Sequence, residues 1–203
     1  MPRLARALFT AALVCGAAAQ AQSSDPLARR HQGFFFRGDL GVGYFRTTAT
    51  NGLQDVTLSG GGGALGVNVG ASLAENLILS ANLWSATAVA PTVSAGGSST
   101  NLNQSFVSLI ALGPSLTYYA MPANVYLTGT AGFGKLSVSK NNPSSTSMGP
   151  HFRFSLGKEW WTTDQWGLGM AAVVSLGANR DDGADNATWH TVAASFSFSA
   201  TYN

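Results

Sequence analysis

The sequence predicts an all-β protein: an eight-stranded antiparallel up-and-down transmembrane β-barrel with short periplasmic turns and longer extracellular loops. Three observations lead to this fold class: an export signal at the N-terminus, alternation of apolar and polar residues in eight segments, and a regular alternation of short and long connections. The chain has 203 residues, only 10% of them charged, which suits one folded domain and not a disordered chain.

The first residues have the composition of a secretory signal peptide. Arg3 and Arg6 precede an apolar run over residues 7–19, and Ala19-Gln20-Ala21 matches a cleavage site. We therefore predict a signal peptide over residues 1–21, a periplasmic N-terminal tail over 22–32 and an outer-membrane β-barrel over 33–203.

Removal of the signal changes the charge and the cysteine count. The formal net charge of +2 falls to zero without Arg3 and Arg6, and the single cysteine, Cys15, is lost as well. A neutral chain offers no basic surface for nucleic acid, so nucleic acid is not an expected partner. Without cysteine, the exported chain must be stabilised by something other than a disulfide.

Apolar and polar residues alternate along nearly the whole mature chain. In the first segment, residues 33–45, Phe34, Leu40 and Tyr44 share one face, while Arg37 and Asp39 share the other. The remaining predicted strands are residues 64–73, 77–89, 106–119, 125–138, 151–161, 166–176 and 191–202. Where the pattern is regular, their apolar faces carry, in chain order, Leu65 and Val69, Leu79 and Leu83, Leu127 and Phe133, Phe154 and Leu156, Leu168 and Leu176, and Phe196 and Phe198.

The fourth segment, 106–119, is the least regular, because both of its faces are apolar near Leu109 and Ile110. Each segment can still cross a membrane as a tilted strand, which takes about 9 to 11 residues. The wholly apolar faces would contact lipid, and the small or polar faces would line the lumen. The sheet must close on itself, since unpaired backbone groups are not tolerated in hydrocarbon.

The connections alternate in length. Short turns are expected at residues 74–76, 121–124 and 162–165, and longer polar loops at 46–61, 91–104, 139–150 and 178–187. Outer-membrane barrels have short periplasmic turns and longer extracellular loops. An even number of strands then places both termini on the periplasmic side. A soluble periplasmic barrel of the lipocalin type is the alternative fold, but it would have to bury apolar faces inward and expose polar ones.

The pattern resembles the small eight-stranded outer-membrane barrels of the OmpA, OmpX and OmpW type over residues 33–202. The resemblance rests on GFFFRGDLGVGYF (33–45), LGPSLTYYAMPANVYLTGTAGFG (112–134) and SFSFSATYN (195–203), which are specific for fold and not for activity. It implies recognition by the outer-membrane insertion machinery during assembly. The family's last residue is typically Phe or Trp, whereas Tyr202 is here followed by Asn203.

Four charged residues fall on the predicted inward faces. Arg37 and Glu159 lie near the periplasmic rim, and Asp39 and Arg153 lie further up. An eight-stranded barrel is just wide enough for side chains to fill its interior. We therefore expect two ion pairs that plug the lumen, because desolvated charges must be paired. The competing interpretation is that these residues line a wet cavity.

Amphipathic aromatic residues occur near the strand ends, where a membrane interface favours them. These predicted interface residues are Tyr44, Tyr118, Trp160, Trp166 and Tyr202. Lys158 faces outward in the same register, and its ammonium group is expected to reach the headgroups.

The catalytic and nucleotide-binding patterns are weak. GTAGFGKL (129–136) approaches a phosphate-binding loop, but Leu136 replaces the required Ser or Thr, so we interpret it as a glycine-rich strand. His31, His151 and His190 show no paired spacing, and we predict no metal site and no cofactor.

A lipid-modifying enzyme would need His190 to meet an acid, Asp181 or Asp182, and Ser175 at the outer rim. No HxS motif is present at any histidine, so a solvated rim histidine is the preferred interpretation. Asp181, Asp182 and Asp185 could bind a divalent cation that bridges lipopolysaccharide, but an acidic loop is usually only hydrated.

The sequence therefore predicts a non-enzymatic integral outer-membrane protein, monomeric, with a structural or surface-interaction role through its extracellular loops. Its expected partners are outer-membrane lipids and lipopolysaccharide. A narrow channel for small apolar solutes, which the OmpW-like resemblance implies, is the first alternative. A lipid-modifying outer-membrane enzyme is the second.

Overall fold

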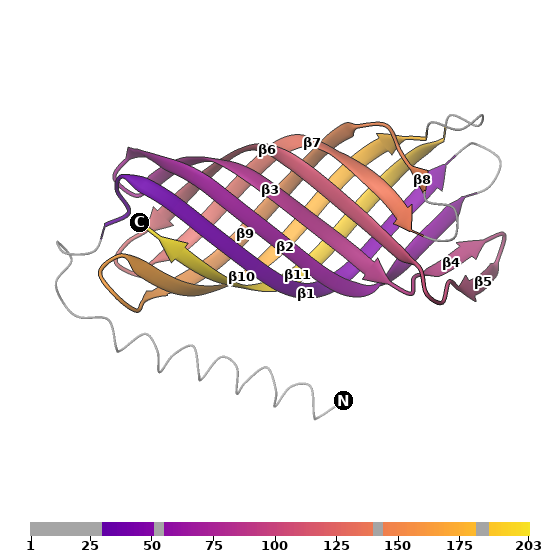
Figure 1. Cartoon of the computed structure of the whole chain (residues 1–203), viewed down its shortest axis with the longest axis horizontal. Helices are drawn as coiled ribbons and strands as arrows, with labels where there is room; N and C mark the ends of the chain where they lie inside the picture. Colours follow the sequence, from indigo (N-terminus) through magenta and orange to yellow (C-terminus); the bar gives the residue numbers. More distant parts are fainter. Residues whose placement is uncertain (1–29, 51–54, 140–143, 182–186) are drawn as a thin grey trace, which may run out of the picture.

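The computed structural model describes residues 30–50, 55–139, 144–181 and 187–203. Within these residues, eight long strands form the wall and three short strands lie at one end (Figure 1). The long strands are β1 (Phe34–Thr50), β2 (Val56–Ala74), β3 (Leu77–Val89), β6 (Phe106–Ala120), β7 (Val125–Ser139), β9 (Gly149–Trp161), β10 (Trp166–Arg180) and β11 (Thr188–Tyr202). The short strands are β4 (Thr92–Ala95), β5 (Ser98–Asn101) and β8 (Ser144–Ser145). No helix in the described part of the chain is long and apolar enough to cross a membrane.

The wall is a closed antiparallel barrel, as predicted. Each long strand pairs with its neighbours in the chain, and β1 pairs with both β2 and β11, so the wall has no free edge. The offset of the closed sheet can be followed from each residue to its paired residue on the next strand. Starting from Phe35 on β1, these pairings pass once through every long strand and return to β1 at Phe45, ten residues further along. This offset tilts the strands against the barrel axis, as closure requires.

The two faces of the wall have the polarity expected of a membrane barrel. Leu40 and Val42 on β1 point outward and are 65% and 73% exposed, while Phe35 and Arg37 on the same strand point inward and are buried. The outward faces of the other long strands are likewise mainly apolar. A barrel of the lipocalin type would have the opposite arrangement, so that alternative is wrong.

The first two strands extend further than predicted. β1 ends at Thr50 and β2 begins at Val56, so the predicted loop over 46–61 is wrong at residues 46–50 and 56–61, while residues 51–54 lie outside the described residues. The glycines at positions 60–63 suggested a loop, but they pair with residues 42–45 of β1. A Cβ at Gly62 would overlap the carbonyl oxygen of Thr87 on β3, so close packing of strands requires glycine here.

The other connections agree with the predicted alternation in length. Short turns join β2 to β3, β6 to β7 and β9 to β10 at the end where the C-terminus lies (Figure 1). The predicted loop over 91–104 contains the β4–β5 hairpin, and β4 extends the sheet by pairing with β2. The predicted signal peptide, 1–21, lies outside the described residues, as does the predicted tail up to residue 29.

Candidate functional site

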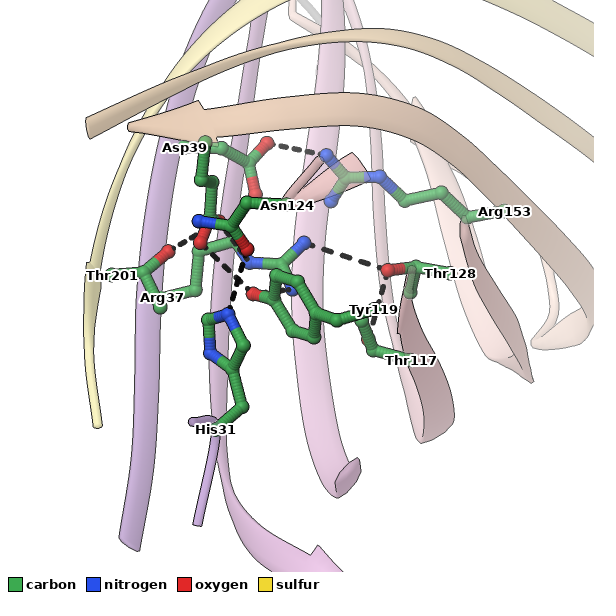
Figure 2. A network of polar contacts seen from close by, with 10 residues as sticks. His31, Arg37, Asp39, Thr117, Tyr119, Asn124, Thr128, Arg153 and Thr201 are labelled. Carbon is green, nitrogen blue, oxygen red and sulfur yellow. Dashed lines mark hydrogen bonds and ion pairs between the residues drawn. The ribbon is translucent and has the colours of Figure 1, made fainter. Parts of the chain in front are cut away.

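The lumen contains a layer of four buried charges, contributed by β1 and β9. The Nε of Arg37 lies 3.5 Å from Oε1 of Glu159, and an Nη of Arg153 contacts Oδ1 of Asp39. Figure 2 shows Arg37, Asp39 and Arg153 of this layer inside the barrel. None of the four side chains is more than 9% exposed. The structure thus brings together the four residues predicted to face the lumen, in two ion pairs.

The lower pair is held by neutral donors and aromatic rings. Thr201 donates to Oε1 of Glu159 at 2.6 Å, and the Tyr119 hydroxyl donates to Oε2 at 3.1 Å. Arg37 in turn donates to the Tyr119 hydroxyl at 3.0 Å, and its guanidinium carbon lies 4.1 Å from the centre of the Tyr126 ring. These partners stabilise the buried carboxylate and guanidinium, because they replace the hydrogen bonds to water that both groups lose on burial.

The upper pair borders a small polar cavity. The cavity measures about 10 Å³, close to the space of one water molecule, and is lined in part by Asp39, Arg153, Asn68 and Asn82. The Oδ1 atoms of both asparagines and one Nη of Arg153 are buried without a protein partner there. A single bound water would satisfy several of these groups at once.

The loop end of the lumen is filled by apolar side chains, which the sequence reasoning did not anticipate. Buried residues from six strands form this cluster: Phe45, Leu58, Ala86, Ala88, Val107, Leu109, Leu136 and Ala193. Val93 and Leu102 from the connection that carries the hairpin pack against it. The apolar inward face near Leu109, which made the fourth predicted strand irregular, was the sequence signal for this cluster.

The short-turn end is closed by His31, which the sequence did not single out. Its ring is buried, stacks on Tyr119 with ring centres 3.5 Å apart, and places Nε2 2.8 Å from Oδ1 of Asn124 (Figure 2). Burial lowers the pKa of His31, outweighing the opposite effect of the hydrogen bond to Asn124. Because Oδ1 of Asn124 can only accept, Nε2 of His31 donates this hydrogen bond. The part of the predicted tail that the structure describes, residues 30–32, therefore packs against the short-turn end of the barrel.

Comparison with known proteins bears on the fold. No family model matches the sequence, and no curated protein matches it. Neisserial surface protein A (NspA) has a similar structure, with a TM-score of 0.52 and 14% sequence identity over 84% of this chain and 96% of that chain. The chain has the fold of the small bacterial outer-membrane β-barrels.

Two more solved outer-membrane proteins align at lower scores. OprG from Pseudomonas aeruginosa gives a TM-score of 0.46 with 11% identity over 88% of this chain and 100% of that chain. Ail, the attachment invasion locus protein of Yersinia pestis, gives a TM-score of 0.38 with 11% identity over 83% of this chain and 99% of that chain.

The aromatic residues predicted for the interfaces all face outward in this outer-membrane barrel fold. Tyr118, Trp160, Trp166 and Tyr202 lie near the short-turn end, where Trp166 and Tyr202 pack edge to face with ring centres 5.3 Å apart. Tyr44 lies in the loop half of β1. Lys158 also faces outward, and its Nζ reaches the Ala123 carbonyl in the neighbouring turn at 2.9 Å.

The structure does not assemble the catalytic group considered from sequence. Ser175 is buried in the lumen, whereas His190 is exposed on the outside of the wall. Asp181 accepts a hydrogen bond from Trp189 Nε1 at 3.3 Å, and Asp182 and Asp185 lie outside the described residues. Residues 129–136 belong to β7, as predicted. Among the described residues, no cluster of His, Cys, Asp or Glu could hold a metal ion.

Proposed function

We propose that this protein is a monomeric integral outer-membrane barrel with a closed lumen, without enzymatic or channel activity. Its biochemical role then belongs to the loop end, which faces the cell exterior, in structural or surface interactions. The proposed partners are outer-membrane lipids and lipopolysaccharide, with the insertion machinery acting during assembly.

The observation that carries this proposal is the filling of the lumen. His31, the charged layer and the apolar cluster follow one another between the two ends, all with buried side chains. A cavity beside Trp84 measures about 20 Å³, again the space of about one water molecule. Side chains that fill a small barrel to this degree favour a plug over a pore.

The alternatives have less support. An apolar solute crossing the lumen would have to displace the Arg37–Glu159 pair and its hydrogen bonds, which is costly for buried charges. An enzyme that modifies lipids would need Ser175 and His190 on the same side of the wall. Neither arrangement is favoured by a specific contact among the described residues.

Cell fractionation followed by electrophoresis tests the membrane part of the proposal. Recovery in the outer-membrane fraction, with a folded band that shifts on boiling, is expected of a closed barrel. Recovery in the soluble periplasmic fraction would overturn it. Protease treatment of intact cells should cut at least one connection at the loop end, and protection of all four of these connections would contradict an external loop end.

Conductance in a planar lipid bilayer tests the closed lumen. The folded protein should leave the bilayer conductance at the level of a protein-free control, because buried side chains occupy the lumen at the charged layer. Stable, reproducible conductance steps would overturn the plug and favour the channel.

A further inference from the structure

Three side chains able to contact an anion follow one another around the outside of the barrel. Arg46 on β1, His190 on β11 and Arg180 on β10 are exposed, and the three strands are adjacent in the wall (Figure 1). His190 pairs with Thr48, two residues beyond Arg46, and with Ala178, two residues before Arg180. The three side chains therefore form one patch on the outer surface, here called the cationic patch.

The cationic patch lies where the apolar outer face ends. On β1, the outward positions from Phe34 to Tyr44 carry apolar or aromatic side chains or glycine, and the next outward position is Arg46. That stretch covers about 25 Å along the barrel axis at the usual rise and tilt of a strand, which is the height of the apolar band of an outer-membrane barrel. The cations are therefore at the level of lipid headgroups on the loop side.

The arginines of the patch, Arg46 and Arg180, have no ion-pair partner in the described part of the chain. The acid next in the chain, Asp181, accepts a hydrogen bond from Trp189. The two guanidinium groups are thus available to an external anion.

A groove lies on the same wall nearer the short-turn end, where Gly38 on its floor precedes Arg46 by eight residues on β1, about 20 Å along the barrel axis at the same rise and tilt. It measures about 500 Å³, and Leu40, Leu168 and Phe198 stand around Gly38 and Ala200. Gly38 and Ala200 are paired across β1 and β11, so two small residues lie side by side among taller ones. A Cβ added at Gly38 meets no atom within 4 Å, which leaves the floor of the groove open.

We propose that the outer wall of β1, β11 and β10 binds one lipid whose phosphate headgroup carries a net negative charge. The guanidinium groups of Arg46 and Arg180 and an N–H of His190 contact the phosphate oxygens, and an acyl chain lies in the groove over Gly38. Guanidinium groups suit phosphate because they donate two parallel hydrogen bonds. The proposal rests on the membrane-spanning function proposed above, and it names the lipid class that this wall selects.

A second outward groove provides a matched control. It measures about 290 Å³, is lined in part by Leu116, Gly129 and Phe154, and lies on strands β3, β6, β7 and β9. Lys135 is the exposed cation on the outward face of β7. This wall has a groove and, among the described residues, Lys135 in its loop half and Lys158 near the short-turn end, but it lacks the three adjacent donors of the cationic patch.

The test is lipid binding by the refolded full-length mature protein in detergent micelles, measured by native mass spectrometry. The probes are diphosphorylated lipid A, phosphatidylcholine of matched chain length, and inorganic phosphate. One lipid A per barrel is expected, with weaker binding of phosphatidylcholine and of inorganic phosphate. Equal binding of lipid A and phosphatidylcholine would overturn the role of the cationic patch, and binding of inorganic phosphate as tight as that of lipid A would overturn the role of the groove.

Variants separate the two parts of the site. Replacing both arginines, Arg46→Gln with Arg180→Gln, should weaken lipid A binding about 30-fold, since each cation near an anionic lipid surface strengthens binding about fivefold. Gly38→Leu should fill the groove and weaken binding about tenfold by excluding acyl-chain surface. Lys135→Gln and Gly129→Leu, on the control wall, should each stay within about twofold of the wild type.

Equal losses for the variants of both walls would contradict a defined site and indicate a diffuse surface charge. The heat-shifted band of each variant checks that it has folded. A wild-type protein without that band would count against the membrane barrel itself. A folded wild type that does not retain lipid A would count against this site alone.

Discussion

Glu159→Gln tests the charged layer most sharply, because it removes one charge and almost no volume. Glu159 is fully buried and lies against Arg37, which is 3% exposed. Gln can still accept from Thr201, but Arg37 would keep a buried charge without its carboxylate partner. Removing one partner of a buried ion pair typically costs about 3–5 kcal/mol of folding free energy.

The matched control is Glu75→Gln at the short-turn rim. Glu75 pairs with Arg30 at 2.8 Å, but both side chains are more than a third exposed, so the change should cost less than about 1 kcal/mol. Equilibrium unfolding in urea, with the protein in lipid vesicles and the folded band as the readout, measures both. If Glu159→Gln loses no more stability than Glu75→Gln, the charges of Arg37 and Glu159 are hydrated in the lumen, and the proposed desolvated plug is wrong.

Three further predictions concern the ends and the wall of the barrel. The imidazole of His31 should titrate below the ordinary pKa of 6.5, as measured by NMR, because burial lowers its pKa in the docked state. Docking of this residue should then be fully stable above about pH 6.5 and weaken as the pH falls below that value, since the undocked form takes up the proton; a titration above 6.5 would contradict this. Trp84→Ala, at a lumen side chain only 2% exposed, should lower the free energy of unfolding by about 3–5 kcal/mol, and a loss below about 1 kcal/mol would mean that the lumen collapses around the change. Gly62→Val should prevent a stable heat-shifted band, because its Cβ would overlap the Thr87 carbonyl, whereas the outward Gly61→Val, whose Cβ meets only one atom at 3.9 Å, should fold.

The period of two in the sequence was sufficient to predict the wall. A one-residue change of register would move Leu40 into the lumen and Arg37 into lipid, so the two faces of β1 define its orientation without any knowledge of its neighbours. The same reasoning placed Arg37, Asp39, Arg153 and Glu159 inside. Which of these four side chains form ion pairs depends on the ten-residue offset with which the sheet closes, and that offset brings the predicted partners together.

The remaining features depend on contacts between residues distant in the sequence. The start of β2 was obscured by the glycines at 60–63, which are typical of loops but are required here by the close approach of β3. The burial of His31 could not be predicted, since it depends on Tyr119 at the end of β6 and on Asn124 in the turn between β6 and β7. The apolar cluster at the loop end likewise joins one or two residues from each of six strands, and on any one strand they only make the alternation of polar and apolar residues less regular.

Bilayer conductance tests the proposed closure of the lumen most directly. The refolded wild type and the Glu159→Gln variant would be recorded side by side with a protein-free membrane, after the folded band has been verified for each. A wild type indistinguishable from the protein-free membrane is the predicted result, because the Arg37–Glu159 layer and the apolar cluster both cross the lumen. A wild type that gives steady, ohmic conductance steps would contradict a plugged barrel.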